Sequence, residues 1–322
     1  MSDAAKLLHD GGLVAFPTET VYGLGADACN DQAVAKIYEV KGRPSDHPLI
    51  VHVSSMNHLG QWASEIPDFA IKLARDFWPG PMTLILKRSE FAKDFITGGQ
   101  DTVGVRVPNH VVALALLEAA EQIGIKGIAA PSANRFGHVS PTSAAAVQAE
   151  LGAFMNETDL VLDGGSCAVG VESTIIDCTG DIPRVLRPGA ITDEMIVEST
   201  GLKIFRNDRF IDGGEGFVFV QPKEEIRVSG SLENHYSPDA TVILDQQPTV
   251  GQGFIALASI ATPEGVIRLA APTTNEEFAQ HLYTALREGD NQGLQQIVVV
   301  QPEGSGIAVA VRDRLSRAAN GR

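Results

Sequence analysis

Short apolar runs alternate with amphipathic stretches along the first 200 residues of this 322-residue chain. Such runs, bounded by glycine, proline or polar clusters, are typical of strands buried in a sheet. The pattern predicts strands at residues 13–16, 49–53, 83–86, 103–107, 128–130, 160–162, 174–177 and 184–186. Because helical stretches separate these strands, we predict an α/β domain with a mixed rather than a purely parallel sheet.

Helices are predicted where apolar residues recur every three or four positions. They fall at residues 1–10, from Asp31 onward, and at residues 69–77, 111–123 and 142–151. Asp31 is predicted to be the N-cap of its helix. Ser140 and Pro141 are predicted to supply the cap and the first position of the helix at 142–151.

The regular pattern weakens after about Ile196 and returns near residue 241. Residues 207–216 are polar and rich in glycine, and residues 222–225 are charged, which is typical of a linker. Later strands are predicted at residues 241–244, 254–258, 266–269 and 296–300, and helices at 276–288 and 308–319. Since 322 residues are long for one core, we predict a domain at 1–200, a linker or lid at 201–240, and a smaller, Rossmann-like α/β domain at 241–322.

Composition narrows the class of protein. The apolar fraction of 44% and the charged fraction of 20% are ordinary for a globular protein. No apolar run approaches the roughly 20 residues that cross a bilayer, and the N-terminus lacks the apolar core of a signal peptide. We therefore expect no membrane association and a cytoplasmic location.

The three cysteines are widely spaced, which argues against a disulfide framework or a zinc site. The formal net charge of -15 argues against stable tRNA binding, because lysine and arginine contacts to phosphates supply most of that affinity.

The segment Lys41-Gly42-Arg43-Pro44 places two cations on a tight turn just before the predicted strand at 49–53. Because the chain as a whole is strongly acidic, a general excess of basic residues does not explain these two cations. They suggest a clamp for a polyanion. The alternative is a solvated helix C-terminus, where cations offset the helix dipole. Arg106 lies inside an apolar strand and needs a partner, either an anionic ligand or a carboxylate such as Glu19.

Small polar residues follow the predicted strands. Ser132 and Asn134 come directly after residues 128–130, where open α/β sheets bind ligands, although turns also favour such residues. Arg184 and Arg187 flank another strand, and either one could reach the same cleft. No P-loop and no nucleophile with an adjacent base are present in the sequence. The residues alone support a phosphate-bearing ligand and name no reaction.

Several segments, in order along the chain, closely resemble the motifs of the YrdC-type threonylcarbamoyl-AMP synthases. They lie at residues 17–25, 41–52, 78–81, 104–108, 130–137, 171–177 and 184–189. The segment His235-Tyr236-Ser237-Pro238 resembles the long form of the family, which has an additional C-terminal domain. One departure is Ser229-Gly230-Ser231-Leu232, which stands where the long form often has a proline-glycine pair.

The resemblance implies a YrdC-like twisted, open, mixed sheet with helices, joined by a long linker to a second α/β domain. It also implies a nucleotidyltransferase that condenses L-threonine, bicarbonate and ATP into threonylcarbamoyl-adenylate and pyrophosphate. Mg²⁺ is expected on the ATP phosphates, with no metal ligand assigned to the protein. A downstream transferase would pass the threonylcarbamoyl group to an adenosine beside the tRNA anticodon.

The resemblance further implies residue roles. Lys41 and Arg43 would be catalytic as well as ATP-binding. The residues expected around ATP are Lys41, Arg43, His47, Thr102, Ser132, Asn134, Ser140, Arg187 and Tyr236. Those expected around L-threonine are Thr20, His52, Arg106 and Ser173, with Arg106 pairing with the carboxylate. Residues 229–236 are expected to form a lid that protects the labile adenylate from water.

Two other functions remain open from the sequence. One is an RNA-binding module with the same fold and no adenylate synthesis, which the acidic composition disfavours. The other is a carbamoyl-transferring maturation factor that contains this domain type. Such factors carry additional cysteine clusters, and this chain has only three separate cysteines.

Overall fold

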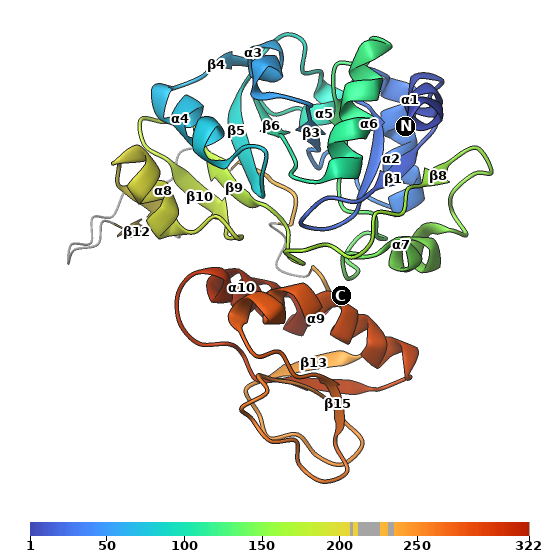
Figure 1. Ribbon diagram of the computed structural model, residues 1–322, viewed down its shortest axis with the longest axis vertical. Helices are drawn as coiled ribbons and strands as arrows, with labels where there is room; N and C mark the ends of the chain where they lie inside the picture. The colour runs from blue at the N-terminus through green and yellow to red at the C-terminus, as the bar shows by residue number, and fades with distance from the viewer. Residues whose placement is uncertain (207–208, 212–225, 231–234, 322) are drawn as a thin grey trace.

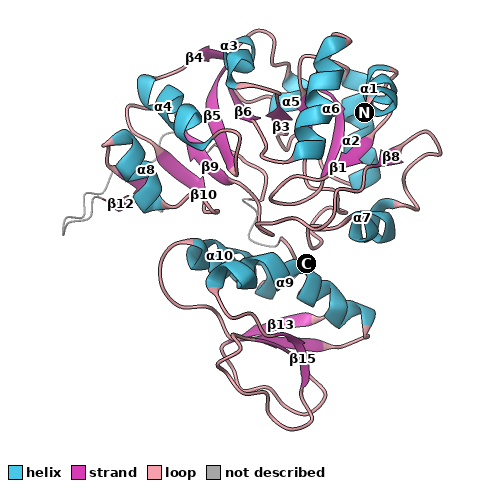
Figure 2. Cartoon of the chain, viewed as in Figure 1, coloured by secondary structure: helices cyan, strands magenta, loops and turns pink. Residues whose placement is uncertain are grey.

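The computed structural model describes residues 1–206, 209–211, 226–230 and 235–321. These residues form a large α/β domain and a smaller C-terminal α/β domain, which meet through the helices of the smaller one (Figure 1). Figure 2 shows that helices and loops enclose the large sheet, whereas the helices of the C-terminal domain lie on the side of its sheet that faces the first domain. No helix in these residues is both long and apolar enough to span a membrane.

The large sheet runs in the order β12-β11-β10-β9-β5-β6-β3-β7-β2-β1-β8, with β4 paired to β5. Its strands are β1 Val14–Phe16, β2 Gly23–Asp27, β3 Ile50–His52, β4 Ala63–Glu65, β5 Met82–Arg88, β6 Thr102–Arg106, β7 Ile128–Ala129, β8 Leu160–Val161, β9 Thr174–Asp177, β10 Arg184–Arg187, β11 Ile204–Arg206 and β12 Arg209–Ile211. The β3–β6 and β5–β9 pairs are parallel, while β5–β6 and β9–β10 are antiparallel. The prediction of a mixed sheet is confirmed.

Helices surround this sheet. They are α1 Ser2–His9, α2 Asp31–Lys41, a 3-10 helix Met56–His58, α3 Leu59–Trp62, α4 Asp68–Phe77, α5 Asp94–Thr97, α6 Val111–Gln122, α7 Ala144–Leu151 and α8 Asp193–Thr200. Two predicted caps are wrong by a few residues. Asn30, not Asp31, caps α2 by accepting a hydrogen bond from the Ala33 amide at 3.1 Å. Ser143, not Ser140, caps α7. Its backbone is extended, and its hydroxyl accepts a hydrogen bond from the Ala146 amide at 3.2 Å.

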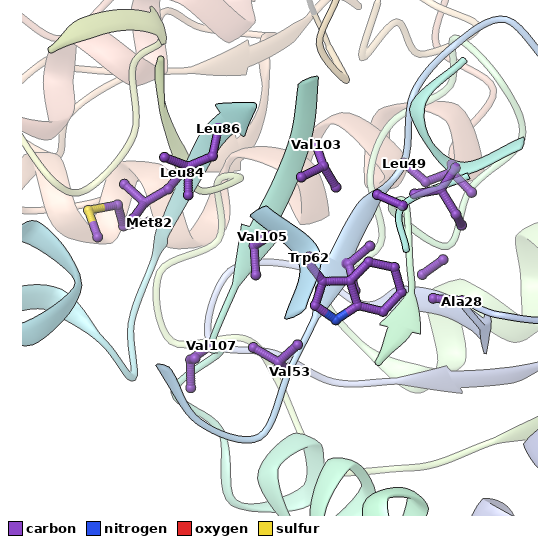
Figure 3. Packing of buried hydrophobic residues seen from close by; sticks show 14 of the residues in the cluster. Ala28, Leu49, Val53, Trp62, Met82, Leu84, Leu86, Val103, Val105 and Val107 are labelled. Carbon is purple, nitrogen blue, oxygen red and sulfur yellow. The ribbon is translucent and has the colours of Figure 1, made fainter. Parts of the chain in front are cut away.

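The largest core cluster of the first domain lies between the sheet and helices that include α2, α3 and α4. Alternate residues of neighbouring strands, such as Leu84 on β5 and Val105 on β6, face the same cluster as Trp62 (Figure 3). The indole of Trp62 is fully buried, and its Nε1 donates to the Lys126 carbonyl at 3.3 Å. Glycine is required at 127, because a Cβ there would lie 2.7 Å from a Val51 methyl and 3.0 Å from the indole.

Several strands were not predicted from the sequence. β2 is rich in glycine, and β4 is short with two exposed residues, so neither has the apolar pattern of a strand. β11 and β12 extend the large sheet into residues 204–211, within the segment predicted to be a linker. Residues 212–225 of that predicted linker lie outside the described residues. The domain limits at 200 and 240 stay a prediction.

The C-terminal domain is a parallel four-stranded sheet with the order β13-β16-β14-β15. Its strands are β13 Thr241–Leu244, β14 Gly253–Ile255, β15 Ile267–Ala270 and β16 Gln296–Val299, and its helices are α9 Asn275–Asn291 and α10 Ile307–Ala319. α9 and α10 lie between this sheet and the first domain (Figure 1). The predicted second α/β domain is confirmed.

Candidate active site

A cavity lined by several charged and polar side chains lies in the first domain, and residues 229–230 and 235–236 form part of its wall. Its walls come from the loop between β1 and β2, from β3 and β6, from the turn after β7, and from the segment that leads into β9 and β10. Of the residues predicted from the sequence, the described lining includes Thr20, Arg43, His52, Arg106, Ser132, Ser173, Arg187 and Tyr236. Motifs from distant parts of the chain therefore meet in one place.

Arg106 has a carboxylate partner inside the protein. Its Nη2 lies 2.7 Å from Glu19 Oε2, and both side chains are buried. Nη1 donates to Thr20 Oγ1 at 3.0 Å, and Nε donates to the Gly80 carbonyl at 3.3 Å. The Glu19 oxygens have no well-aligned hydrogen bond among the described residues, so charge attraction rather than directed bonding holds the pair. The expectation that Arg106 needs a partner is confirmed, and Glu19 is that partner.

Arg43 and Arg187 are buried without such a carboxylate. Arg187 donates to the Ser173 carbonyl at 2.9 and 3.1 Å, to Ser173 Oγ at 3.1 Å and to the Ser229 carbonyl at 2.8 Å. Arg43 donates to the Pro48 carbonyl at 3.0 Å and to Ser229 Oγ at 3.2 Å, and its Nε has no partner among the described residues. No described carboxylate forms an ion pair with either guanidinium. Burial lowers the pKa of Arg43 to about 10 and also lowers the pKa of Arg187, so both sites have an unmet demand for negative charge.

Lys41 lies outside the described lining of the cavity, and its predicted catalytic and ATP-binding roles stay predictions. It is the last residue of α2 and only 2% exposed, so it is not a solvated helix end. Its Nζ donates to the Ser132 carbonyl at 2.6 Å and to the Asn134 carbonyl. Burial, and then the neighbouring Arg43, lower the pKa of Lys41 well below its ordinary value. In this structure Lys41 braces the turn that presents Ser132 to the cavity.

Four other predicted ATP residues lie outside the described lining. Asn134 donates from Nδ2 to the Arg135 and His138 carbonyls at 2.7 and 2.9 Å, which shapes the same turn as Lys41. His47 makes an edge contact with the Phe136 ring at 5.3 Å between centroids. Thr102 begins β6, and Ser140 is turned toward Glu172. Their predicted roles toward ATP stay predictions.

The cover of the cavity is tied to the arginines. Ser229 accepts from both Arg43 and Arg187, and its hydroxyl donates to the Pro48 carbonyl at 3.2 Å. Tyr236 is fully buried with a left-handed backbone (φ 63°), and its hydroxyl has no partner among the described residues. Gly230 has φ +79°, and a Cβ there would lie 2.0 Å from the Tyr236 hydroxyl. The described residues of the predicted lid line the cavity, whereas residues 231–234 fall outside the described part, and the role of the lid in protecting the adenylate stays a prediction.

Two buried histidines line the cavity in neutral form. Burial, strengthened by Arg106, lowers the pKa of His52 to about 3. Burial likewise lowers the pKa of His235 to about 3, against the opposing effect of Glu172. The Nδ1 atoms of both rings have no partner among the described residues. They are therefore available to a ligand as neutral hydrogen-bonding groups.

Glu172 is a lining residue that sequence reasoning missed. It is 6% exposed and accepts hydrogen bonds from Ser140 Oγ at 2.6 Å, Tyr283 Oη at 2.9 Å and Arg314 Nε at 2.7 Å. Despite its burial, Arg314 and Arg187 hold the pKa of Glu172 down at about 2. The signal in the sequence is an acidic residue between apolar Val171 and a predicted strand. No group of three or more His, Cys, Asp or Glu side chains in the described residues could hold a metal ion.

The fold and this cavity define a two-domain α/β protein of the YrdC-like class. Residues 6–189 match the family described as "Telomere recombination", which groups Sua5, YciO and YrdC. Residues 191–320 match the family described as "Threonylcarbamoyl-AMP synthase, C-terminal domain". Together the two matches span nearly the whole chain.

Relatives that match nearly the whole chain are named threonylcarbamoyl-AMP synthase. The chain is 39% identical over 335 residues to the threonylcarbamoyl-AMP synthase of Pyrococcus abyssi, covering 99% of this chain and 94% of that protein. It is 37% identical to the enzyme of that name from Bacillus subtilis, covering 100% and 93%. The crystal structure of P. abyssi Sua5 complexed with L-threonine superposes with a TM-score of 0.85 at 39% identity, covering 99% of this chain and 94% of that one. The chain belongs to the threonylcarbamoyl-AMP synthase family, in its Sua5 form with the additional C-terminal domain.

Proposed function

We propose that this protein condenses L-threonine, bicarbonate and ATP into L-threonylcarbamoyl-adenylate, with release of pyrophosphate. The observation that carries the proposal is the pair of buried guanidiniums, Arg43 and Arg187, which line the cavity with only neutral partners among the described residues. Buried cations that lack a directly paired carboxylate favour an anionic ligand, because the ligand supplies the missing ion-pair partner. Family membership supports ATP as that ligand.

The proposed reaction needs no protein nucleophile. The threonine amine adds to CO2 derived from bicarbonate and loses a proton, which gives a carbamate. A carbamate oxygen then attacks the α-phosphorus of ATP, and the bond to the bridging oxygen breaks as pyrophosphate leaves. This transfer of the AMP moiety makes the protein a nucleotidyltransferase. Because such transfer depends mainly on positioning and charge stabilisation, fixed arginines and hydroxyls suffice.

The cavity offers separate groups for the two substrates. Arg106 with Thr20 would bind the threonine carboxylate, and His52 and Ser173 would bind its amine and hydroxyl. Arg43, Arg187 and Ser132 would bind the phosphates and ribose, with Tyr236 over the nucleotide. Lys41 would act in catalysis with Arg43, and Lys41 and Asn134, which shape the turn that carries Ser132, would also contact ATP.

A magnesium ion would arrive with ATP rather than be held by side chains of the cavity. Among the described lining residues the one carboxylate is Glu172, and both of its oxygens already accept hydrogen bonds from protein groups. When bound, Mg²⁺ would neutralise phosphate charge, and its ligands would be phosphate oxygens and water rather than side chains of this cavity.

The downstream steps are also part of the proposal. The adenylate is labile, so a separate transferase would accept the threonylcarbamoyl group and pass it to tRNA. The net charge of -15 supports a protein that does not itself bind tRNA stably. A cytoplasmic location stays a prediction.

Pyrophosphate release by the purified protein tests the proposal. The reaction would contain ATP, Mg²⁺ and bicarbonate, with L-threonine, with L-serine, or with no amino acid. Release that depends on L-threonine is the expected result. A protein that binds ATP and yet releases no pyrophosphate with threonine would contradict the proposal and favour a binding module.

A further inference from the structure

The wall of the proposed ATP site contains a negative charge. Glu172 lines the cavity together with Arg187 and His235, whose pKa values both respond to its carboxylate. Phosphates of ATP would enter this same cavity under the proposed function. A bare carboxylate beside them would repel the substrate, and a low local dielectric would strengthen that repulsion.

The C-terminal domain supplies the counter-charge. Arg314, on α10, is 1% exposed and donates from Nε to Glu172 Oε2 at 2.7 Å. Its Nη2 donates to the Pro188 carbonyl at 3.0 Å, one residue after the strand that carries Arg187. Its Nη1 donates to Asp313 Oδ2 at 2.5 Å, and Asp313 is paired in turn with Arg317. Each guanidinium nitrogen of Arg314 thus donates a hydrogen bond, and the side chain contacts the cavity wall through Glu172.

A second group from the same domain contacts Glu172 and the cover. Tyr283, on α9, donates to both carboxylate oxygens, at 2.9 and 3.1 Å. Its ring stacks on Tyr236 with 5.8 Å between centroids and an interplanar angle of 24°. The Arg314 guanidinium lies 5.3 Å from the centroid of the Tyr236 ring. The ion pair is therefore continuous with the residue that covers the site.

We propose that Arg314 is a positioning residue for the ATP site, which it serves by cancelling the charge of Glu172 at the cavity wall. The proposal rests on the adenylate-forming function given above. It assigns the C-terminal domain a part in substrate binding: α10 supplies the cation that pairs directly with Glu172, in addition to the nearby charge of Arg187. Without that charge Glu172 would oppose the phosphates that Arg43 and Arg187 attract.

A purely structural role is the alternative. A buried ion pair broken on one side destabilises a protein whether or not a ligand is near. Stability alone therefore cannot separate the two roles, and ATP affinity must be measured beside it. The two explanations differ for a protein in which both charges are removed. Charge cancellation predicts that ATP affinity returns when Glu172 also becomes neutral, even though the ion pair is absent.

The test is a double-variant cycle on the full chain, with ATP binding measured by calorimetry in the absence of threonine. We expect Arg314→Met to weaken ATP binding about tenfold or more, and Arg314→Met/Glu172→Gln to regain most of that loss, to within about threefold of the parent protein. Arg312→Met is the matched control. Arg312 lies on the same helix, and among the described residues it donates to the Pro302 and Gly304 carbonyls of its own domain, so its removal should leave ATP affinity unchanged.

Specific results would overturn the inference. One is an Arg314→Met protein that binds ATP as the parent does, and another is a double variant that binds as weakly as Arg314→Met. Should Arg314→Met not fold, Arg314→Lys and the double variant carry the test, and both are expected within about threefold of the parent. Tight binding by the lysine variant with a tenfold or greater loss in the double variant would show that the positive charge itself is needed, and would overturn charge cancellation.

Failure of this inference is distinguishable from failure of the proposed function. A parent protein that binds ATP but releases no pyrophosphate with threonine contradicts the function, while the binding cycle still reports on Arg314. A parent protein that makes the product but shows no recovery in the double variant contradicts the inference alone.

Discussion

The two halves of the cavity treat their arginines differently. In the proposed threonine half, Arg106 faces Glu19 at 2.7 Å, and the fold itself balances the charge. In the proposed ATP half, Arg43 and Arg187 are equally buried but donate to carbonyls and hydroxyls of Pro48, Ser173 and Ser229. The difference indicates a modest demand for ligand charge in one half and a strong demand in the other, as expected for a single carboxylate and a polyphosphate.

The same difference predicts opposite consequences of mutation. Removing a cation that has its own carboxylate leaves a buried anion behind, so stability should fall. Removing a cation whose hydrogen bonds, among the described residues, go only to neutral groups breaks no direct ion pair, so ligand binding should fall more than stability. The four predictions below test this contrast, in decreasing order of expected effect.

Arg106→Met should destabilise the protein strongly. The change leaves the Glu19 carboxylate buried without its counter-charge, and breaking such a pair costs about 3–5 kcal/mol. Thermal unfolding monitored by calorimetry measures the loss. The double variant Glu19→Gln/Arg106→Met, which has no unpaired buried charge, should recover much of the stability. A double variant no more stable than Arg106→Met would argue that the pair does not balance its charge internally.

Arg187→Ala should weaken ATP binding more than it weakens folding. Hydrogen bonds to charged groups contribute about 1.5–3 kcal/mol each, which corresponds to a loss of roughly 10- to 150-fold in ATP affinity. Arg184→Ala is the matched control, because Arg184 lies on the same strand but pairs with Asp177 at 2.9 Å. We expect Arg43→Ala to behave as Arg187→Ala does. Equal ATP affinities for the Arg184 and Arg187 variants would refute the proposal that Arg187 binds the ATP phosphates.

Acid should destabilise the protein through its two buried histidines. His52 and His235 have folded-state pKa values of about 3, whereas an unfolded histidine titrates near 6.5. Between these values the unfolded chain binds more protons, so stability present above pH about 6.5 is lost as the pH falls toward 3. The slope is at most about 1.4 kcal/mol per pH unit for each histidine. Unfolding midpoints measured from pH 7 to 4.5 should decline, and the decline should be shallower in His52→Asn.

Gly230→Ala should have the smallest effect on stability and act mainly on the cover of the ATP half. The left-handed backbone at 230 costs a residue with a Cβ roughly 1–2 kcal/mol, and that Cβ would displace the Tyr236 hydroxyl. We expect lower ATP affinity, measured by calorimetry. Adding Tyr236→Phe removes the hydroxyl oxygen that clashes and should restore part of the ATP affinity. If the single and double variants bind ATP equally, the effect of Gly230→Ala does not come from a clash with the Tyr236 hydroxyl.

The sequence predicted most of the first domain because its buried strands are apolar and its cations fall in motifs. Arg106 was predictable, since a charge inside an apolar strand requires a partner. Lys41 was not, because the spacing of residues 41–44 cannot show that the lysine turns to the Ser132 carbonyl. Strands β2 and β12 lack an apolar pattern, so only their sheet neighbours reveal them. Glu172 could not be placed either, because its partner Arg314 lies 142 positions along the chain.

We propose that one cavity joins threonine, bicarbonate and ATP, and an incubation with labelled bicarbonate can follow this reaction to its product. The full-length protein would be incubated with ¹⁴C-bicarbonate, ATP, Mg²⁺ and L-threonine, and the products separated at once. We expect acid-labile label in a compound that contains both AMP and threonine, formed only when all three substrates are present. Pyrophosphate release without label in such a compound, or no label at all from protein that binds ATP, would contradict it.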